Sequence, residues 1–372
     1  MPQLIMADED GVLEMLRDSV ATFAQGRPGP QSLRKLRAAG ADLDLEQWQE
    51  MAAAGWIGLM LPEALGGANL GIREQAVISH ALGQALVPSP IASASVLSSA
   101  LLARVADSPE RRRLAAGLVQ GRSIVVPAVA AGRDGEGVAA RSLEGGVLLD
   151  GRRAFVEGAR SASDLLVVAR AGSEDLLVSV PAHAEGLERC DRQTVDGGII
   201  SSLMLSNCLV GNERILARGD LCAMVETSIN LARTALAAEL AGIASQAFEL
   251  ARQYTIDRKQ FGKPLASFQV LQHRLVDLWA EAEFACSAVV NAVERCEQSS
   301  EREARLAVYA AKARAADAAA FVGRQAIHLF GAMGFTDECD IGLYLKRAIN
   351  LGACLGQPES LRLQFIKEER AA

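Results

Sequence analysis

The chain has 372 residues, of which 50% are hydrophobic and 22% are charged, so its composition is ordinary for a globular protein. This length predicts two or three domains, at about 150 residues for each domain. The net charge of -7 excludes general nucleic-acid binding, which requires a basic face.

The seven cysteines and four histidines are scattered along the chain, without a CxxC pair or closely spaced histidines. No metal site is therefore predicted. Unpaired cysteines favour a reducing compartment, so we expect a cytoplasmic protein. No charged segment followed by an apolar one has the pattern of a secretory signal, and no uncharged apolar run reaches the roughly 18–20 residues that span a bilayer, so no membrane partner is expected.

Residues 1–121 are predicted to form an N-terminal helical domain. The stretch "GVLEMLRDSVATFAQG" places five apolar side chains at helical spacing: Val12, Leu13, Leu16, Val20 and Phe23. A later short helix leads into an apolar turn that stops at Pro62, and the next helix ends at Pro88 and Pro90. Another begins with Ser108 as its N-cap and Pro109 in its first turn.

Residues 122–216 differ from the preceding residues in composition and spacing, and they predict a middle antiparallel β domain, a sandwich or a barrel. Short runs rich in Val and Leu, such as "DLLVVARA" and "EDLLVSVPA", are separated by Gly, Asp and Asn every eight to twelve residues.

Residues 217–372 predict a C-terminal four-helix bundle, with long helical patterns over 218–257, 264–298, 300–331 and 338–369. No GxGxxG follows a strand, which argues against a Rossmann domain. The predicted fold class is α+β, with helices, a β domain and a bundle in that order.

The segment "YTIDRKQFGKPLASFQVLQHRLVDLWAEAE" (254–283), together with this domain order, resembles the acyl-CoA dehydrogenase family over nearly the whole chain. "PEALGGANLG" (62–71) is similar to a P-E-x-x-G-G motif of that family, and "LFGAMGFTDECDIGLYLKRA" resembles its C-terminal G-G-x-G-F stretch. The resemblance implies an FAD enzyme that oxidises acyl-CoA thioesters to 2-enoyl-CoA. A carboxylate removes the α-proton in such enzymes, and an electron-transfer flavoprotein accepts the electrons.

The resemblance assigns Arg258 to the FAD diphosphate of a neighbouring subunit, because a guanidinium binds phosphate oxygens in bidentate fashion. Gln260 is assigned to phosphate or ribose, and Phe261 to packing near the cofactor. A structural alternative is a helix C-terminus, where these cations interact favourably with the negative end of the helix dipole. Further cofactor contacts are assigned to Gln269 and to the segment His328, Gly331 and Ala332, where the family usually has Gln followed by Gly-Gly.

Two flavin motifs of the family are altered in this chain. "VPAVAAGRDG" (126–135) lacks the Thr, Glu and Ser of the motif that wraps the flavin. In "AFVEG" (154–158), Phe155 stands for an aromatic that covers the ring, and Glu157 replaces a hydroxyl residue. An anion beside the ring disfavours the reduced flavin, whereas a Glu157 that points into solvent has no such effect.

The catalytic carboxylate is missing from both positions where the family has it. These positions correspond to Leu355 and to Ala232, the latter 26 residues before Arg258. Glu359 and Glu239 are weak substitutes. For Glu239 the structural alternatives are a hydrogen bond within the bundle or a salt bridge to an Arg of a neighbouring helix. Two substrate contacts are retained, because Arg233 matches an arginine near the thioester and Asn230 stands where an Asp usually lies.

These features favour one subunit of a heteromeric dehydrogenase, a heterotetramer in which a second acyl-CoA dehydrogenase-like chain supplies the base. Bulky steroid-type and dicarboxylic acyl-CoAs are the substrate classes of such relatives. Alternatives are a homotetramer with a relocated base, a non-catalytic oligomerisation scaffold, and a flavin oxidase or monooxygenase of the same fold.

Overall fold

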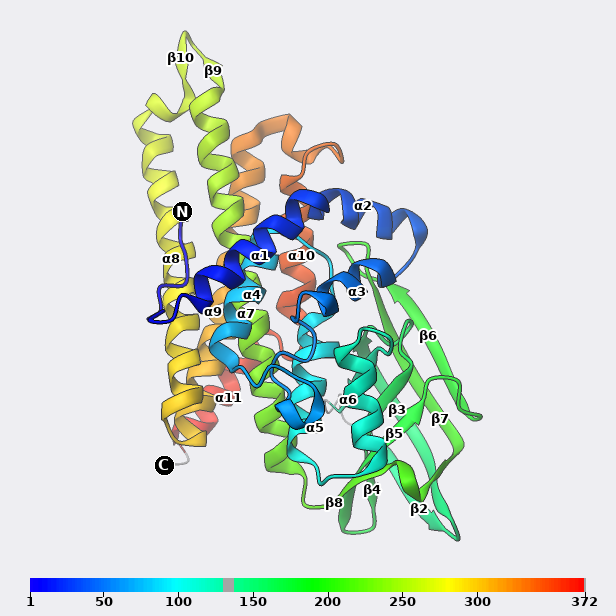
Figure 1. Cartoon of the computed structure of the whole chain (residues 1–372). Helices are drawn as coiled ribbons and strands as arrows, with labels where there is room; N and C mark the ends of the chain where they lie inside the picture. Colours follow the sequence, from blue (N-terminus) through cyan, green and yellow to red (C-terminus); the bar gives the residue numbers. More distant parts are fainter. Residues whose placement is uncertain (130–136, 371–372) are drawn as a thin grey trace. The chain divides into compact units, whose positions relative to one another are not determined.

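The computed structural model describes residues 1–129 and 137–370 and contains two compact units (Figure 1). The first unit is helical and gathers Met1–Lys35, Ile72–Pro88 and Arg233–Ala372. The second unit contains the sheet and comprises Leu36–Gly71 and Ser89–Ala232. N-terminal helices, a central sheet and C-terminal helices follow one another along the chain, which confirms the predicted α+β class. The boundaries of the three sequence domains stay a prediction.

One N-terminal helix begins where the sequence placed its cap, whereas the helix before Pro62 ends at Ala53, nine residues earlier. Ser108 accepts a hydrogen bond from the Arg111 N–H at 3.1 Å, with Pro109 in the first turn, as predicted. Asp44 caps another helix by accepting from two backbone N–H groups. The helices are α1 (Val12–Gly26), α2 (Gly29–Ala39), α3 (Leu45–Ala53), α4 (Ile72–Ala85), the π-helix η2 (Ile91–Leu97), α5 (Ser98–Arg104) and α6 (Pro109–Val119).

The sheet of the second unit has the order β6-β7-β3-β2-β4-β5-β8, with β1 added to β4. The sheet is mostly antiparallel, as predicted, and it is mixed because β1 and β2 both pair with β4 in parallel. The strands are β1 (Val125–Ala128), β2 (Val138–Leu143), β3 (Gly146–Glu157), β4 (Asp164–Ala171), β5 (Glu174–Pro181), β6 (Leu187–Gln193), β7 (Ile199–Gly211) and β8 (Ile215–Gly219).

The C-terminal helices are α7 (Cys222–Asp257), α8 (Gln269–Gln298), α9 (Glu301–Phe330), α10 (Ile341–Ala353) and α11 (Pro358–Arg370). The single helix predicted over 338–369 was wrong. Leu355 (φ 53°) and Gly356 (φ 125°) leave the right-handed helical region and separate α10 from α11. None of the helices in the described residues has the length and hydropathy of a membrane span.

Helices α4 and α7 approach each other closely in the helical unit through a pair of glycines. A Cβ on Gly83 of α4 would overlap the carbonyl oxygen of Glu239, and a Cβ on Gly242 of α7 would overlap that of His80. Both obstacles are helix backbone, which cannot move aside as a flexible side chain can. The two glycines therefore fix the spacing of these helices.

Gly83→Ala and Gly242→Ala are each expected to lower the free energy of unfolding by about 2 kcal/mol, because the added methyl group forces the helices apart. Chemical denaturation monitored by circular dichroism measures this loss. Gly26→Ala is the matched control, since its Cβ would meet nothing within 4 Å in the last turn of α1. That variant should be as stable as the wild type or slightly more stable. Equal stability of all three variants would contradict the packing argument.

Candidate cofactor and substrate site

The segment that follows α7 forms a two-stranded hairpin, in which β9 (Lys259–Gln260) pairs with β10 (Lys263–Pro264). The hairpin projects beyond the ends of α7 and α8 (Figure 1). Its two-residue turn has left-handed backbone at both positions, Phe261 (φ 52°) and Gly262 (φ 78°), as a type I′ turn requires. The Phe261 side chain is 88% exposed. A bulky residue with positive φ is strained, and such strain is concentrated at functional sites.

The cations of the hairpin have no acidic partner within the chain. Among the described residues, no carboxylate pairs with Arg258, Lys259 or Lys263, and all three side chains are exposed. The Lys263 ammonium instead lies 4.2 Å from the centroid of the Phe268 ring. The Arg258 backbone is fixed, because its N–H donates to Tyr254 and its carbonyl accepts from Leu265. The guanidinium is therefore held at the base of the hairpin and is available to an external anion.

The end of α9 lies at the same end of the helical unit as the hairpin. Tyr254 stacks on Phe330 with ring centroids 4.2 Å apart, and its hydroxyl donates to the Phe330 carbonyl at 3.3 Å. His328 precedes Phe330 by two residues in α9, and its Nδ1 is 3.3 Å from Nη1 of Arg274 in α8. The exposed residues Gln269, Gly331 and Ala332 start α8 or follow α9. The structure thus gathers the C-terminal cofactor candidates at one end of this unit.

In the sheet unit, Phe155 occupies an irregularity of strand β3. Its φ is 57°, its side chain is 72% exposed, and the β3–β7 register shifts between Arg153 and Val156. Such a bulge turns one side chain out of the normal alternation of a strand. Two residues later, half-buried Glu157 accepts a hydrogen bond from the Ser93 hydroxyl of η2 at 3.0 Å. Its carboxylate is therefore held by the protein and does not point freely into solvent.

The flavin-wrapping motif expected over 126–135 lies mostly outside the described residues, which resume at 137. Its first residues form the end of strand β1 (Val125–Ala128).

Arg233 and the Leu355 turn come together in the helical unit. The buried Arg233 side chain donates from Nε to the Leu355 carbonyl at 2.8 Å, and its guanidinium lies 5.3 Å from the Tyr309 ring centroid. Leu355, at one of the two missing base positions, has left-handed backbone. Ala232, at the other position, is fully buried. Asn230 is also buried, a short distance earlier in α7.

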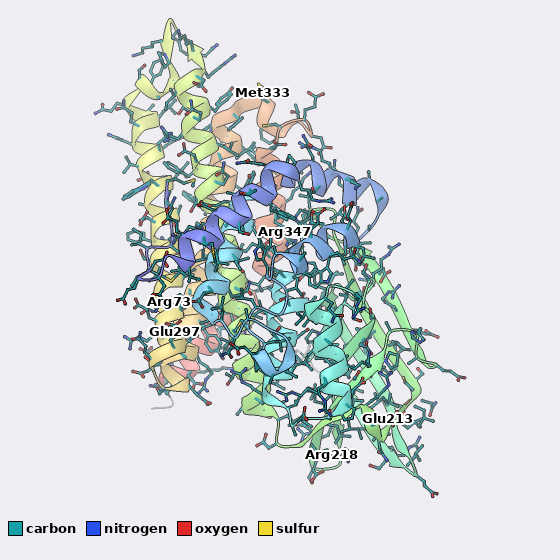
Figure 2. All side chains as sticks on the ribbon, in the orientation of Figure 1. Arg73, Glu213, Arg218, Glu297, Met333 and Arg347 are labelled. Atoms are coloured by element: carbon teal, nitrogen blue, oxygen red, sulfur yellow. The ribbon has the colours of Figure 1, made fainter. Side chains whose placement is uncertain are left out.

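The contacts and positions of the two substitute carboxylates, Glu239 and Glu359, are those of residues that stabilise the fold. Arg347 of α10, which is labelled in Figure 2, donates to one oxygen of Glu239 from Nη2 at 3.0 Å and from Nε at 3.2 Å, and both side chains are buried. This salt bridge is one of the structural alternatives that the sequence left open for Glu239. Glu359 is exposed in the first turn of α11, where a carboxylate stabilises the positive end of the helix dipole.

The sequence analysis missed Lys312, which is completely buried in α9. Its Nζ donates to the carbonyls of Leu351 at 3.0 Å and Gly352 at 3.1 Å. Burial lowers the pKa of this amine from 10.5 to about 8. A signal was present, because Lys312 follows buried Val308 and precedes buried Ala316 by four residues each, on one helix face.

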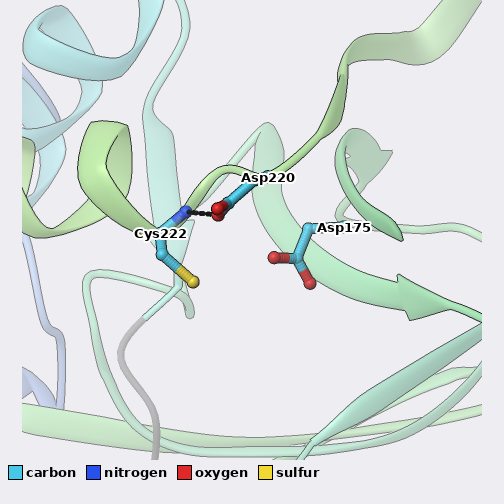
Figure 3. Close-up of side chains that lie close together, drawn as sticks. All are labelled: Asp175, Asp220 and Cys222. Carbon is cyan, nitrogen blue, oxygen red and sulfur yellow. Dashed lines mark hydrogen bonds between the residues drawn. The ribbon is translucent and has the colours of Figure 1, made fainter. Parts of the chain in front are cut away.

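A group of possible metal ligands lies in the sheet unit, where atoms of Asp175, Asp220 and Cys222 are within 4.8 Å of one another (Figure 3). The Asp220 carboxylate accepts from the Cys222 N–H at 3.0 Å at the start of α7. Asp175 pairs with Arg170 at 2.9 Å. Asp220 also raises the pKa of the Cys222 thiol, which disfavours the thiolate that a metal requires. Helix capping and an ion pair account for this cluster.

Comparison with known proteins identifies the class. The family model for the acyl-CoA dehydrogenase C-terminal domain matches residues 222–368, and the model for the N-terminal domain matches 12–122. The chain therefore belongs to the acyl-CoA dehydrogenase family, whose members bind FAD and oxidise CH–CH bonds.

Three individual proteins are informative relatives. Acyl-CoA dehydrogenase FadE34 of Mycobacterium tuberculosis is 27% identical over 96% of this chain, which spans only 47% of that relative. The ChsE4-ChsE5 complex from Mycobacterium tuberculosis has the same fold, with a TM-score of 0.90 at 24% identity over 99% of both chains. A variant of the Tcur3481-Tcur3483 steroid acyl-CoA dehydrogenase has a TM-score of 0.86 at 28% identity, and the match covers 97% of this chain and 99% of the other.

Glu239→Gln is expected to lower the free energy of unfolding by about 3 kcal/mol, because it leaves the Arg347 charge buried without its counterion. Urea denaturation of the purified chain measures this loss. The matched control is Glu359→Gln, which removes an exposed carboxylate and should change stability by less than about 0.5 kcal/mol. If Glu239→Gln abolished turnover while leaving stability intact, Glu239 would be a catalytic base and its structural role would be wrong.

Proposed function

We propose that this chain is one subunit of a heteromeric, FAD-dependent acyl-CoA dehydrogenase. The observation that carries the proposal is a mismatch within one polypeptide. Arg258 and its neighbouring cations are exposed without an internal counterion among the described residues, while the positions for a catalytic base hold Leu355 and Ala232. The chain thus offers a site for an anion but no proton acceptor at either position. A partner chain that supplies the catalytic glutamate accounts for both features.

The donor set at the hairpin fits the diphosphate arm of FAD. A guanidinium and two ammonium groups without acidic partners in the described part of the chain suit phosphate oxygens, and the exposed Phe261 ring offers an apolar contact. Arg258 and Gln260 would hold the diphosphate, with Gln269, His328, Gly331 and Ala332 along the same arm. Bound FAD supplies the hydride acceptor for oxidation of the Cα–Cβ bond.

The β3 residues fit a flavin ring poorly. Phe155 can cover a ring, but the Glu157 carboxylate occupies the place of a hydroxyl residue and is held there by Ser93. A fixed anion opposes the negative charge that a reduced flavin carries. We therefore propose that the FAD is shared across a subunit interface and that the partner's motif makes most of the contacts to its flavin ring.

The substrate contacts support a retained acyl-CoA site. Arg233 is buried and fixed by Leu355 and Tyr309, so its position is well defined, and Asn230 is buried on the same helix. The small side chains of Ala232, Ala237 and Ala238 add no bulk to this part of α7. We propose a bulky steroid-type or dicarboxylic acyl group. The word steroid in the name of the Tcur3481-Tcur3483 enzyme supports the first choice.

The proposal also includes an electron acceptor and a cytoplasmic location. The reaction produces a reduced flavin, so an electron-transfer flavoprotein is the proposed acceptor. No disulfide joins the seven cysteines, all of which lie in the described part of the chain, and this is consistent with a reducing cytoplasm.

Coexpression separates a subunit from a self-sufficient enzyme. We expect the chain expressed alone to be colourless. Coexpression with a second acyl-CoA dehydrogenase-like chain that has a catalytic glutamate should yield a yellow complex that oxidises an acyl-CoA with a ferrocenium acceptor. If the chain alone is yellow and active, the heteromeric proposal fails. If neither preparation binds flavin or CoA, a scaffold of the same fold is favoured.

Arg258→Ala is expected to strip most of the flavin from the coexpressed complex, because the variant loses a charge-assisted contact to the diphosphate. The ratio of FAD to protein, read from the absorbance of the purified complex, measures the effect. Arg252→Ala is the matched control, since this arginine of α7 already pairs with Glu249. Stoichiometric FAD in the Arg258 variant would count against the shared-cofactor arrangement.

A further inference from the structure

The C-terminal end of α10 is closed by a buried charge. The last carbonyls of a helix have no partner within the helix and need donors from elsewhere. Lys312 of α9 supplies such donors to Leu351 and Gly352, at 3.0 and 3.1 Å, from a side chain with no solvent exposure. A cation at this position also interacts favourably with the negative end of the helix dipole.

The turn that follows is held by a second buried cation. Arg233 of α7 donates to the Leu355 carbonyl at 2.8 Å and lies over the ring of Tyr309, which precedes Lys312 by three residues in α9. Beyond the turn, Leu361 of α11 packs against Tyr309 and Ala313. A single face of α9 thus contacts every element that meets at this turn.

The backbone of this turn needs such support. Leu355 has φ 53°, which is unfavourable for a branched side chain, and the Cβ of any residue at Gly356 would crowd Leu361. A strained conformation persists only where its surroundings determine it. The Cys354 N–H donates to the Leu351 carbonyl, the same oxygen that Lys312 binds, so cap and turn share one acceptor.

We propose that Lys312 is the positioning residue of the turn Cys354–Gln357, and that it works together with Arg233 to fix the left-handed backbone at Leu355. Lys312 is not a base for a substrate, because its hydrogen bonds go to backbone carbonyls and the side chain is fully buried. The inference concerns this chain alone and stands whether or not the heteromeric proposal is correct.

The buried amine makes the equilibrium between the closed and the open turn depend on pH. Burial lowers the pKa of Lys312 to about 8, against 10.5 for a solvated lysine. The charged and titratable groups that act on it are the Arg233 guanidinium, which also lowers the pKa, and the Cys354 thiolate, which raises it. A closed turn therefore binds fewer protons than an open turn that exposes the amine. The closed form is favoured increasingly as the pH rises from 8 to 10.5, and opening is easiest below pH 8.

Hydrogen exchange of the Cys354 amide tests the proposal in the full chain, together with any subunit that copurifies. Between about pH 8 and 10, chemical exchange accelerates about tenfold per pH unit, and the protection of the closed turn should rise about tenfold per unit. In the wild type the two changes cancel, and the measured rate should be nearly flat.

In Lys312→Met, the Leu351 and Gly352 carbonyls lose the lysine donor, and the titrating group is gone. Exchange at about pH 7 should be about tenfold faster than in the wild type, and it should rise steeply with pH. Lys346→Met is the matched control, because Lys346 lies on α10, the helix that ends at this turn, and has a partly exposed side chain. It should keep the flat wild-type profile.

Identical rates and pH profiles in Lys312→Met and the wild type would overturn the proposal. If Lys312→Met does not fold, Lys312→Gln replaces it, and exchange rates in that variant identical to those of the wild type would equally overturn the proposal. Neither flavin nor acyl-CoA enters the measurement, so its failure is separate from failure of the proposed function.

Discussion

The hairpin after α7 carries positive charge that the described part of the chain does not neutralise. Several other guanidinium groups of this protein have carboxylate partners. Arg347 pairs with Glu239, Arg73 pairs with Glu297 (Figure 2), and Arg113 binds both Glu110 and Asp164. Arg258 is held by its backbone at the base of a strained hairpin and has no such carboxylate among the described residues. A protein that is acidic overall thus exposes these cations where an external anion can bind them. The proposed function depends on this unneutralised charge.

Backbone strain marks three positions that the family resemblance singles out. Phe155, Phe261 and Leu355 are bulky residues with φ between 52° and 57°. They correspond to the aromatic that covers the flavin, the aromatic of the hairpin and one place of the catalytic base. The chain thus keeps costly backbone geometry where the side-chain chemistry has changed at Leu355 and beside Phe155. In our proposal, the shared cofactor explains this combination, because one chain can keep the shape of a site whose chemistry a partner performs.

Local rules predicted much of the fold from sequence. The N-cap at Ser108 and the helical spacing of Val12 to Val20 describe interactions between near neighbours, which a sequence displays directly. The helical pattern over 338–369 did not reveal the break between α10 and α11, because Leu355 has no intrinsic preference for left-handed backbone, although the family resemblance places a turn around Leu355. Tertiary contacts from Lys312 and Arg233 support it there. The parallel pairing of β1 with β4 was missed for a similar reason, because it joins distant segments.

The sequence allowed us to name candidate residues of the site, but it was less informative about the contacts that their side chains make. The sequence named Glu239 but could not choose between a base and a salt bridge, and the structure places Arg347 against it. Lys312 lies in an Ala-rich helix, where its spacing from Val308 and Ala316 indicates the buried face but not the carbonyls that it binds. Its burial depends on the end of a helix 40 residues further along the chain. Interactions of this kind follow from packing, which a periodic pattern does not specify.

The most direct test of the central claim is an experimental structure of the natural assembly with its nucleotide bound. We expect the Arg258 guanidinium within about 3 Å of a diphosphate oxygen, with that nucleotide's flavin ring seated in a different protomer. An Arg258 that faces solvent, far from any nucleotide, would contradict the account.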